Sequence, residues 1–526
     1  MNSTRVSGAL SADALPADDR TSLWIAVSLG LVCVAVHMAT NGGYGYFRDE
    51  MYYLACGDHL DWGYVDHAPL IALTARLIRL TLGDSLPALR FLPALAGGLS
   101  VFFTGLIARE LGGGRFAVLL ASLGVLVTPL YLAIDTIFTM NAFEPLFWMA
   151  SVLILLRAIH RNRPRLLLWL GVTAGIGLEN KHSMAFFIVA LLGGLALSPE
   201  RRLLLTRQMA LAAAIALLLF LPNLLWQAAH GWPTLVDLAI SRNKNLSIPL
   251  LVFLSRQILM LSPANMLIWL PGLWFLLRGS EAHRARALGW AFLLFLGLML
   301  ALRGKGYYLA PAYPMLFAAG GVFWQSRIRR RWLRIALPST VFWAALPAAP
   351  LALPILPPQS LIRYQKAIHI APMRDYVTES GPLQEEFGDM FGWEEMVGQV
   401  AQIYRSLPPA ERSRAAIFAL NYGEAAAIDL FGPRYGLPKA ISTNQTYFLW
   451  GPHQYDGQVV ILVGFNDDLM AHPQVRRGLE SVFTSIETGP RVEQPYSMNW
   501  EHYSILIGRG LHPPLPELWP HLRLWN

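Results

Sequence analysis

The sequence is dominated by apolar runs of about 20 residues, the length that an α-helix needs to cross a bilayer. Hydrophobic residues make up 54% of the 526 residues and charged residues only 14%, which is unusual for soluble domains. The formal charge of +8 falls in short basic clusters between these runs, so it does not indicate a nucleic-acid partner. The pattern predicts a polytopic membrane protein. The runs lie near 22–41, 88–108, 116–134, 142–158, 208–226, 258–277, 287–302, 307–324 and 335–355.

The basic clusters predict the orientation, because arginine and lysine favour cytoplasmic loops. An even number of crossings must separate the clusters at 157–165 and 201–207, so 166–178 and 184–197 are expected to form two short helices with Lys181 near their turn. This gives eleven spans with a cytoplasmic N-terminus. The first run has no clear cleavage site and is expected to remain as a span. The clusters are within 109–115, 157–165, 201–207, 278–286 and 327–334.

The composition changes after residue 356, and two domains are expected: a transmembrane domain over 1–355 and an extracytoplasmic accessory domain over 356–526. Alternation of short apolar runs with helix-like stretches predicts a small α/β fold for the second. The expected strands are at 415–420, 459–464 and 503–508, and the expected helices at 423–431 and 467–483.

The outer loop 42–87 contains the stretch FRDEMYYLACGDHLDWGYVDHAPL, residues 47–70, with five acidic residues and two histidines. Charges gathered at a bilayer surface indicate a functional site, although a wet loop with solvated acids would look the same. Asp49 and Glu50 directly follow the first apolar run and are surrounded by aromatic residues. A carboxylate in such a place can act as a base, and an aromatic surround can raise its pKa.

The motifs RDEMYYLACG and LDWGYVDHAPL resemble the first outer loop of bacterial membrane glycosyltransferases related to protein O-mannosyltransferases and lipid A aminoarabinose transferases, in the GT-C superfamily. The resemblance covers roughly residues 22–325. It implies a GT-C-like, mostly helical membrane fold. It also implies transfer of a sugar, with inversion, from a polyprenyl-phosphate carrier to an acceptor hydroxyl on the outer side of the membrane.

Carried onto this sequence, the resemblance makes Asp49 the catalytic base and Glu50 its partner. Asp66 and His67 fall where the aminoarabinose transferases have Glu-Lys, so histidine replaces a phosphate-facing lysine and the same donor is not implied. Glu144, in FEPLFW, matches a second acidic position of the family. A carboxylate near the start of a helix also stabilises the helix dipole, which remains an alternative for Glu144.

The resemblance also supplies cations for the departing phosphate. Lys181, in LENKHS, matches a lysine at this turn, and LRGKGYYLAP resembles a Lys-x-x-Tyr-Leu-x-Pro signature through Lys305, Tyr308 and Pro311. Arg303 is a further candidate in the same loop. The alternatives are an interfacial lysine that reaches water and a short outer loop with chance basic residues.

The function expected from these residues is polyprenyl-phosphate-sugar-dependent glycosyl transfer in the bacterial inner membrane, to a glycolipid, polysaccharide or protein. The acids and histidines of 49–67 could hold a divalent cation, but no spacing typical of zinc occurs, and Cys33 and Cys56 lack the spacing of a metal or disulfide framework. The rival is a lipid flippase or transporter. Candidate charges on one face of the membrane and the lack of an inverted repeat speak against it.

Overall fold

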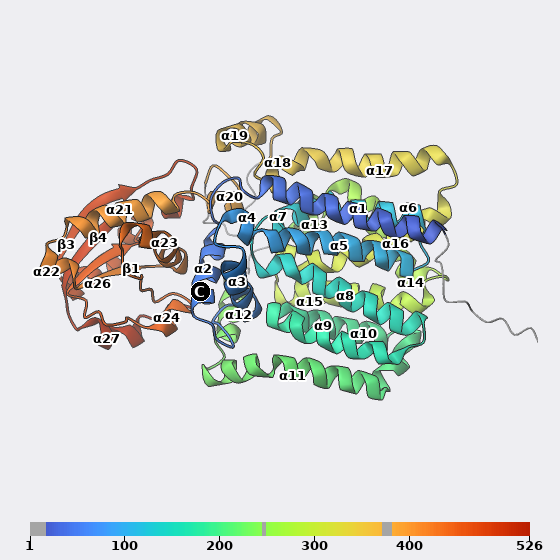
Figure 1. Ribbon diagram of the computed structural model, residues 1–526, viewed down its shortest axis with the longest axis horizontal. Helices are drawn as coiled ribbons and strands as arrows, with labels where there is room; N and C mark the ends of the chain where they lie inside the picture. The colour runs from blue at the N-terminus through green and yellow to red at the C-terminus, as the bar shows by residue number, and fades with distance from the viewer. Residues whose placement is uncertain (1–16, 245–248, 371–380, 526) are drawn as a thin grey trace, which may run out of the picture.

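The computed structural model describes residues 17–244, 249–370 and 381–525. Most helices form one bundle with roughly parallel axes, and a smaller α/β region lies beyond one end of it (Figure 1). The bundle core is formed by α1 (Ala17–Thr40), α5 (Phe91–Glu110) and their neighbours. The other bundle helices are α6 (Arg115–Leu126), α7 (Pro129–Ile134), α8 (Met140–His160), α9 (Leu167–Asn180), α10 (Ser183–Ala196), α11 (Arg207–Ala229), α14 (Met266–Arg278), α15 (Arg286–Leu302), α16 (Tyr313–Arg327) and α17 (Arg331–Ala345).

The chain is a multi-pass membrane protein. Within the described ranges, six helices are long and apolar enough to cross a membrane, or seven if one bent pair counts as a span. The expected short helices on either side of Lys181 are confirmed as α9 and α10. The count of eleven stays a prediction, because α10 and α6 belong to a group of shorter apolar helices. The six are Arg20–Thr40, Leu86–Glu110, Met140–His160, Arg207–Ala229, His283–Leu302 and Arg331–Ala352.

The apolar run expected at 258–277 falls on a bent pair of helices, and its crossing of the membrane stays a prediction. The chain bends by 93° between α13 (Leu250–Met260) and the helical segment Pro263–Arg278. Ser262 has a positive φ of 71°, and Pro263 has no N–H to continue the ladder of α13. Asn265 then donates to the carbonyl of Leu261 at 2.7 Å and so satisfies one of the exposed carbonyls of α13.

The arginine-rich turns gather at one end of the bundle. Arg161 contacts Glu110 at 3.0 Å, and Arg284 contacts Glu200 at 3.2 Å, so turns far apart in sequence meet there. Helix α5 ends at this side and begins beside α2 (Arg48–Asp58) at the other. Asp49, in α2, therefore lies at the end of the bundle opposite the basic turns, as the charge pattern predicts (Figure 1).

The α/β region contains a four-stranded sheet in the order β1-β2-β4-β3. Strands β1 and β2 are parallel, and the other two pairs are antiparallel. The expected strands are confirmed as β1 (Ala415–Ala419), β2 (Val459–Val463) and β4 (Tyr503–Leu511), and the first expected helix is α23 (Tyr422–Phe431). The other helices around the sheet are α20 (Glu385–Gly388), α21 (Trp393–Ser406), α22 (Pro409–Arg412), α24 (Tyr447–Trp450), α25 (Asp467–Ala471), α26 (Pro473–Val482) and α27 (Leu515–Leu518).

The single helix expected at 467–483 is wrong. Helices α25 and α26 are separate because Pro473 starts the second one, and the chain then enters β3 (Phe483–Val492). Most side chains of β3 are exposed, because β3 is an edge strand of the sheet. The mixed, mostly exposed residues of β3 therefore give no apolar run that would reveal the strand in the sequence.

The outer segment between α1 and α5 joins the bundle to the α/β region. It contains α2, α3 (Leu70–Thr81) and α4 (Leu86–Leu89). Buried residues of α2, such as Tyr52 and Leu54, share one hydrophobic core with Trp393, Val397 and Ile428 of the α/β region. The boundary at 356 stays a prediction. Further outer helices are α12 (Pro233–Lys244), α18 (Ala349–Ala352) and α19 (Pro358–Ala367).

Candidate active site

Glu50 is a fully buried anchor for α2. Arg90 donates from Nε to Oε1 and from Nη2 to Oε2 of Glu50, both at 2.8 Å. The backbone N–H of Phe47 donates to Oε2 at 2.9 Å, and that of Phe138 donates to Oε1 at 2.8 Å. These four donors fill the usual acceptor positions of a carboxylate. Glu50 was expected as the catalytic partner of Asp49, which stays a prediction; the structure places it in a buried ion pair that fixes α2.

Arg90 was missed by the sequence reasoning. It also donates to the carbonyl of Asn41 at 2.9 Å and to that of Gly45 at 2.9 Å, and it is fully buried. The sequence does mark Arg90 as a candidate, because it is a lone cation inside the apolar run 88–108, where a charge needs a partner. An acid of the neighbouring loop is the partner that this pattern indicates.

Asp49 is the solvent-accessible acid of the neighbouring pair Asp49 and Glu50. The hydroxyl of Tyr422, from α23, donates to its Oδ1 at 2.8 Å, and 28% of its side chain is exposed. No hydrogen bond among the described residues engages Oδ2. Asp49 lies in the first turn of α2, where the helix dipole stabilises a negative charge. The carboxylate is therefore held by one oxygen and available through the other.

Arg48 is surrounded by an excess of buried acids from the α/β region. Its Nη2 lies 3.2 Å from Asp389 Oδ2, and its guanidinium lies 5.2 Å from the ring of Trp500. Burial raises the pKa of Asp389 to about 7, with Glu385 and Asp49 adding to the rise while Arg48 opposes it. Burial also raises the pKa of Glu424 to about 7. Glu501 has its pKa raised by burial and by Asp389.

This cluster predicts that the fold loses stability as the pH rises. Between about pH 4 and 7 the folded state keeps protons on these acids, whereas the unfolded chain has released them. Their contribution to the free energy of unfolding is therefore present at low pH and is lost as the pH rises through about 7. The raised pKa of Glu424 alone corresponds to a change in the free energy of unfolding on the order of 3 kcal/mol across this pH range. We expect a lower Tm at pH 8.5 than at pH 5.5 in detergent.

Glu424→Gln should flatten this pH dependence, because the glutamine stays neutral at both pH values. The matched control is Glu493→Gln, whose side chain is 64% exposed. An equally steep pH dependence in Glu424→Gln and in the control would contradict the assignment.

Asp66 and His67 lie beside α2 as a second polar pair. The hydroxyl of Tyr52 donates to Asp66 Oδ1 at 2.9 Å and lies 2.8 Å from Thr446 Oγ1 of the α/β region. Burial raises the pKa of Asp66 to about 7; the Tyr52 hydrogen bond opposes the rise, and the negative charge of Asp49 adds to it. Asp66 is therefore a carboxyl that exchanges a proton near neutral pH.

His67 is buried and neutral. Its Nδ1 lies 2.9 Å from the carbonyl of Ala68, so Nδ1 carries the proton, and Nε2 keeps a lone pair with no hydrogen-bond partner among the described residues. Burial lowers the pKa of His67 to about 4. Its ring stacks on Tyr64 with centroids 4.5 Å apart. His67 therefore offers an acceptor, which suits a hydroxyl better than a phosphate oxygen.

Lys181 and Glu144 form an ion pair at the turn between α9 and α10. Lys181 Nζ donates to Glu144 Oε2 at 3.0 Å and to Asn141 Oδ1 at 2.7 Å, and it lies 4.7 Å from the ring centroid of Tyr308. Ser183 donates to the other carboxylate oxygen of Glu144. Lys181 is thus a rigid cation, because its partner and the ring fix its position.

The remaining predicted cations lie near this pair but differ in exposure. Lys181 Nζ and Lys305 Nζ each lie 5.8 Å from the ring centroid of Tyr307, so one ring contacts both. Arg303 is exposed at the end of α15, with a φ of 56°. The structure therefore brings Lys181, Lys305 and Tyr308 together and leaves Arg303 at the rim.

A chain of contacts links the lysine group to the outer segment that contains α2. His182, next to Lys181, lies with Nε2 3.1 Å from Asn223 Oδ1, and Asn223 donates to the carbonyl of Trp62 at 2.9 Å. Burial lowers the pKa of His182. The lysine group therefore lies at the same end of the bundle as the outer segment that carries Asp49.

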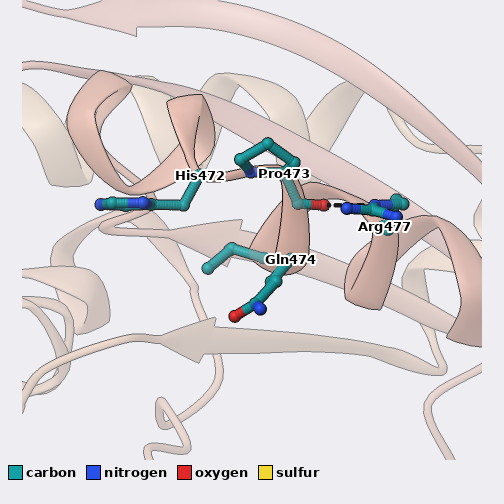
Figure 2. A pocket seen from close by; sticks show the side chains of 5 residues that line it. His472, Pro473, Gln474 and Arg477 are labelled. Atoms are coloured by element: carbon teal, nitrogen blue, oxygen red, sulfur yellow. Dashed lines mark hydrogen bonds between the residues drawn. The ribbon is translucent and has the colours of Figure 1, made fainter.

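Two other places in the described chain have features of a ligand site. A surface pocket at the start of α26 is lined by His472, Pro473, Gln474, Val475 and Arg477 and contains none of the predicted site residues (Figure 2). In the described parts of the chain, the acids and histidines of 49–67 do not converge as a metal set. The set that does is Cys33, His37 and Asp135, whose ligand atoms all lie within 4.8 Å of one another.

Comparisons with known proteins agree with this architecture. The family model for dolichyl-phosphate-mannose-protein mannosyltransferase matches residues 66–226. Lipid A galacturonosyltransferase RgtD from Rhizobium johnstonii is 26% identical over 275 residues, which are 50% of this chain and 56% of that protein's length. The matched part is therefore about half of each protein.

Solved structures show the same fold at low identity. The crystal structure of ArnT from Cupriavidus metallidurans bound to undecaprenyl phosphate has a TM-score of 0.59 at 14% identity, with 92% of this chain and 97% of that chain covered. Arabinofuranosyltransferase AftD from Mycobacteria has a TM-score of 0.50 at 14% identity, with 95% and 40% covered. The resemblance stated for residues 47–70 is confirmed: over about half of its length the chain is similar in sequence to membrane glycosyltransferases, and it shares the fold of ArnT.

Proposed function

We propose that this protein transfers a sugar from a polyprenyl-phosphate carrier to an acceptor hydroxyl, at the periplasmic face of a bacterial inner membrane. The observation that carries the proposal is the half-engaged carboxylate of Asp49, which lies at the same end of the bundle as the fixed cation Lys181. Glycosyl transfer needs a base for the acceptor and a cation for the leaving phosphate. The end of the bundle that carries both is the one opposite the basic turns.

In this mechanism Asp49 Oδ2 accepts the proton of the acceptor hydroxyl. The acceptor oxygen forms its bond to the anomeric carbon from the face opposite the phosphate, while the bond from that carbon to the phosphate oxygen breaks. The phosphate leaves with the electron pair and is stabilised by Lys181 and Lys305, with Arg303 at the rim. Tyr422 holds Oδ1 of Asp49, so that the free oxygen stays aimed at the acceptor.

Asp66 and His67 have the chemistry to bind sugar hydroxyls. The Nε2 lone pair of His67 accepts a hydroxyl proton, and Asp66 accepts or donates because its pKa is about 7. Tyr308, which packs against Lys181, completes the wall on the phosphate side. In this arrangement Glu144 orients Lys181 and does not take part in proton transfer.

The relatives support the lipid carrier and one class of acceptor. One structural neighbour was crystallised with undecaprenyl phosphate, and the curated relative is named as a lipid A galacturonosyltransferase. A glycolipid is therefore the first acceptor to test, followed by polysaccharide and protein.

The test is release of free polyprenyl phosphate from a labelled polyprenyl-phosphate sugar by purified protein supplied with envelope glycolipid. The proposal expects release that depends on the acceptor, with the label recovered on that acceptor by mass spectrometry. A flippase would move the lipid between the leaflets of a vesicle without breaking the sugar–phosphate bond. Movement without cleavage, across a panel of donors and acceptors, would reject the transferase.

Lys181→Met and Glu144→Gln separate the cation that binds phosphate from the anion that orients it. Lys181→Met should weaken binding of polyprenyl phosphate about 10–100-fold, because a charge-assisted hydrogen bond contributes about 1.5–3 kcal/mol. Glu144→Gln removes the neutralising anion and should leave this binding equal or tighter. The measurement is lipid affinity by native mass spectrometry. Unchanged affinity in Lys181→Met, or a comparable loss in both variants, would contradict the assigned roles.

A further inference from the structure

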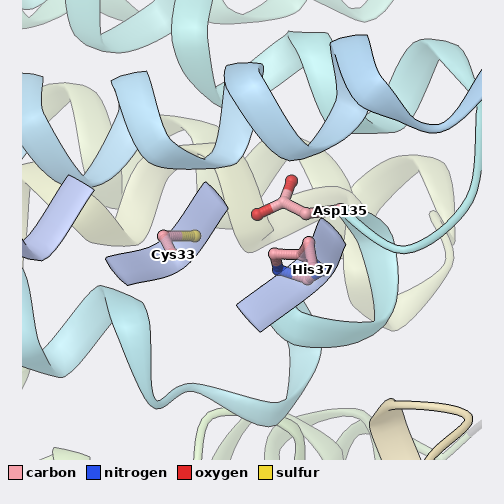
Figure 3. Close-up of side chains that lie close together, drawn as sticks. All are labelled: Cys33, His37 and Asp135. Carbon is pink, nitrogen blue, oxygen red and sulfur yellow. The ribbon is translucent and has the colours of Figure 1, made fainter. Parts of the chain in front are cut away.

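We propose that Cys33, His37 and Asp135 form a zinc site that joins α1 to the segment between α7 and α8. Cys33 and His37 are four residues apart on α1 and therefore project from the same face of the helix, toward Asp135 at the end of α7 (Figure 3). All three side chains are buried, with ligand atoms within 4.8 Å of one another. No hydrogen bond joins any two of these three side chains.

The tautomer of His37 follows from its neighbour. Thr136 Oγ1 donates to the carbonyl of Leu132 at 2.7 Å, so its contact with His37 Nδ1 at 3.3 Å uses the N–H of the imidazole as donor. Nε2 then carries a lone pair, and this buried nitrogen has no hydrogen-bond partner among the described residues. A histidine that binds metal typically donates its other N–H to a second group in this way.

The carboxylate of Asp135 gives a second, independent indication. It is buried, and within the described ranges it makes neither a hydrogen bond nor an ion pair. A buried carboxyl without a partner is costly. Gly97 of α5 packs directly against it, where a larger residue would overlap the carboxylate. The chain therefore leaves room for this group without supplying a donor for it.

The donor set and its charge favour zinc among common divalent ions. Thiolate and imidazole suit Zn²⁺, whereas Mg²⁺ and Ca²⁺ prefer oxygen ligands. A thiolate, a carboxylate and a neutral imidazole around Zn²⁺ sum to zero charge, and a neutral site is the least costly kind at membrane depth. The protein supplies three ligands, so a water molecule would complete the tetrahedron.

The site would fix the segment 135–138, which supports α2. Asp135 is three residues before Phe138, whose N–H donates to Glu50. A metal bound to Asp135 therefore fixes the segment on which the anchor of α2 depends. This inference does not rest on the proposed reaction, because none of the three ligands has a part in that mechanism.

The test uses full-length protein purified in detergent without a histidine tag, stripped with a chelator and titrated with Zn²⁺ or Co²⁺. We expect one tightly bound Zn²⁺ per chain by elemental analysis. The Co²⁺ form should show a thiolate-to-cobalt charge-transfer band, which reports the sulfur ligand directly. A wild-type protein with no stoichiometric metal or no such band would overturn the proposal, and this measurement needs no variant.

Variants then assign the ligands. Cys33→Ser should abolish the cobalt band, and Thr136→Val should weaken Zn²⁺ binding about tenfold by releasing the imidazole, as loss of a supporting hydrogen bond typically does. Cys56→Ser is the matched control, since Cys56 is the other buried free cysteine. Retention of the band in Cys33→Ser, or its loss in Cys56→Ser alone, would place the metal elsewhere and reject the site.

Discussion

Asp49→Asn is expected to lower the rate of sugar transfer by about 10²–10⁴-fold, the usual range for loss of a general base. Asparagine keeps the size of the side chain and can still accept a hydrogen bond from Tyr422, but its amide cannot take the acceptor proton. Binding of the donor should persist, because Lys181 and Lys305 are unchanged. The measurement is acceptor-dependent release of polyprenyl phosphate, with donor affinity determined in parallel.

Tyr422→Phe separates positioning from proton transfer at the same carboxylate. It removes the hydrogen bond to Oδ1 and leaves the carboxylate charged, so the rate should fall by about 10–100-fold, as expected for loss of one hydrogen bond of about 1.5–3 kcal/mol to a charged group. Transfer by Asp49→Asn at the wild-type rate, or a larger loss in Tyr422→Phe than in Asp49→Asn, would remove Asp49 from the base role.

Arg90→Met is expected to destabilise the protein by about 3–5 kcal/mol, since it leaves the buried carboxylate of Glu50 without a cation. The carbonyls of Asn41 and Gly45 also lose their donor. The result would be a large fall in Tm, or loss of folded protein on size-exclusion chromatography. Glu50→Met combined with Arg90→Met should recover part of the loss, because no unpaired charge then remains.

The matched control is Arg79→Met. Arg79 also bridges two acids, Asp58 and Asp84, but the Asp84 side chain is 55% exposed, so the expected cost is below about 1 kcal/mol. Equal effects of the Arg79 and Arg90 variants on Tm would show that the Glu50 pair is not the anchor described above.

The apolar runs predicted most of the bundle because length and composition alone specify a spanning helix. The α9–α10 turn, with Lys181 at its centre, was predicted by counting membrane crossings between basic clusters. The sharp bend at Ser262 was not predicted, because the run 258–277 is apolar on both sides of it. In the α/β region, β3 was missed since an exposed edge strand has no alternating pattern.

At the site, neighbouring acids in the sequence turned out to have separate tasks. Successive residues of a helix point about 100° apart. Asp49 therefore faces Tyr422 while Glu50 faces Arg90. Tyr422 is 373 residues from Asp49, a contact that no local pattern can reveal. Lys181 was predicted as a lone cation, and its pairing with Glu144 required the packing of α8 against α9.

Helix α2 has a consequence for how such proteins can be recombined. It lies outside the bundle, and its buried residues share one hydrophobic core with Trp393, Val397 and Ile428 from the other end of the chain. A chimaera that exchanges the C-terminal region alone would remove part of that core and leave Asp49 without the hydroxyl of Tyr422. Any exchange of the C-terminal region must therefore include α2, because the two share one hydrophobic core.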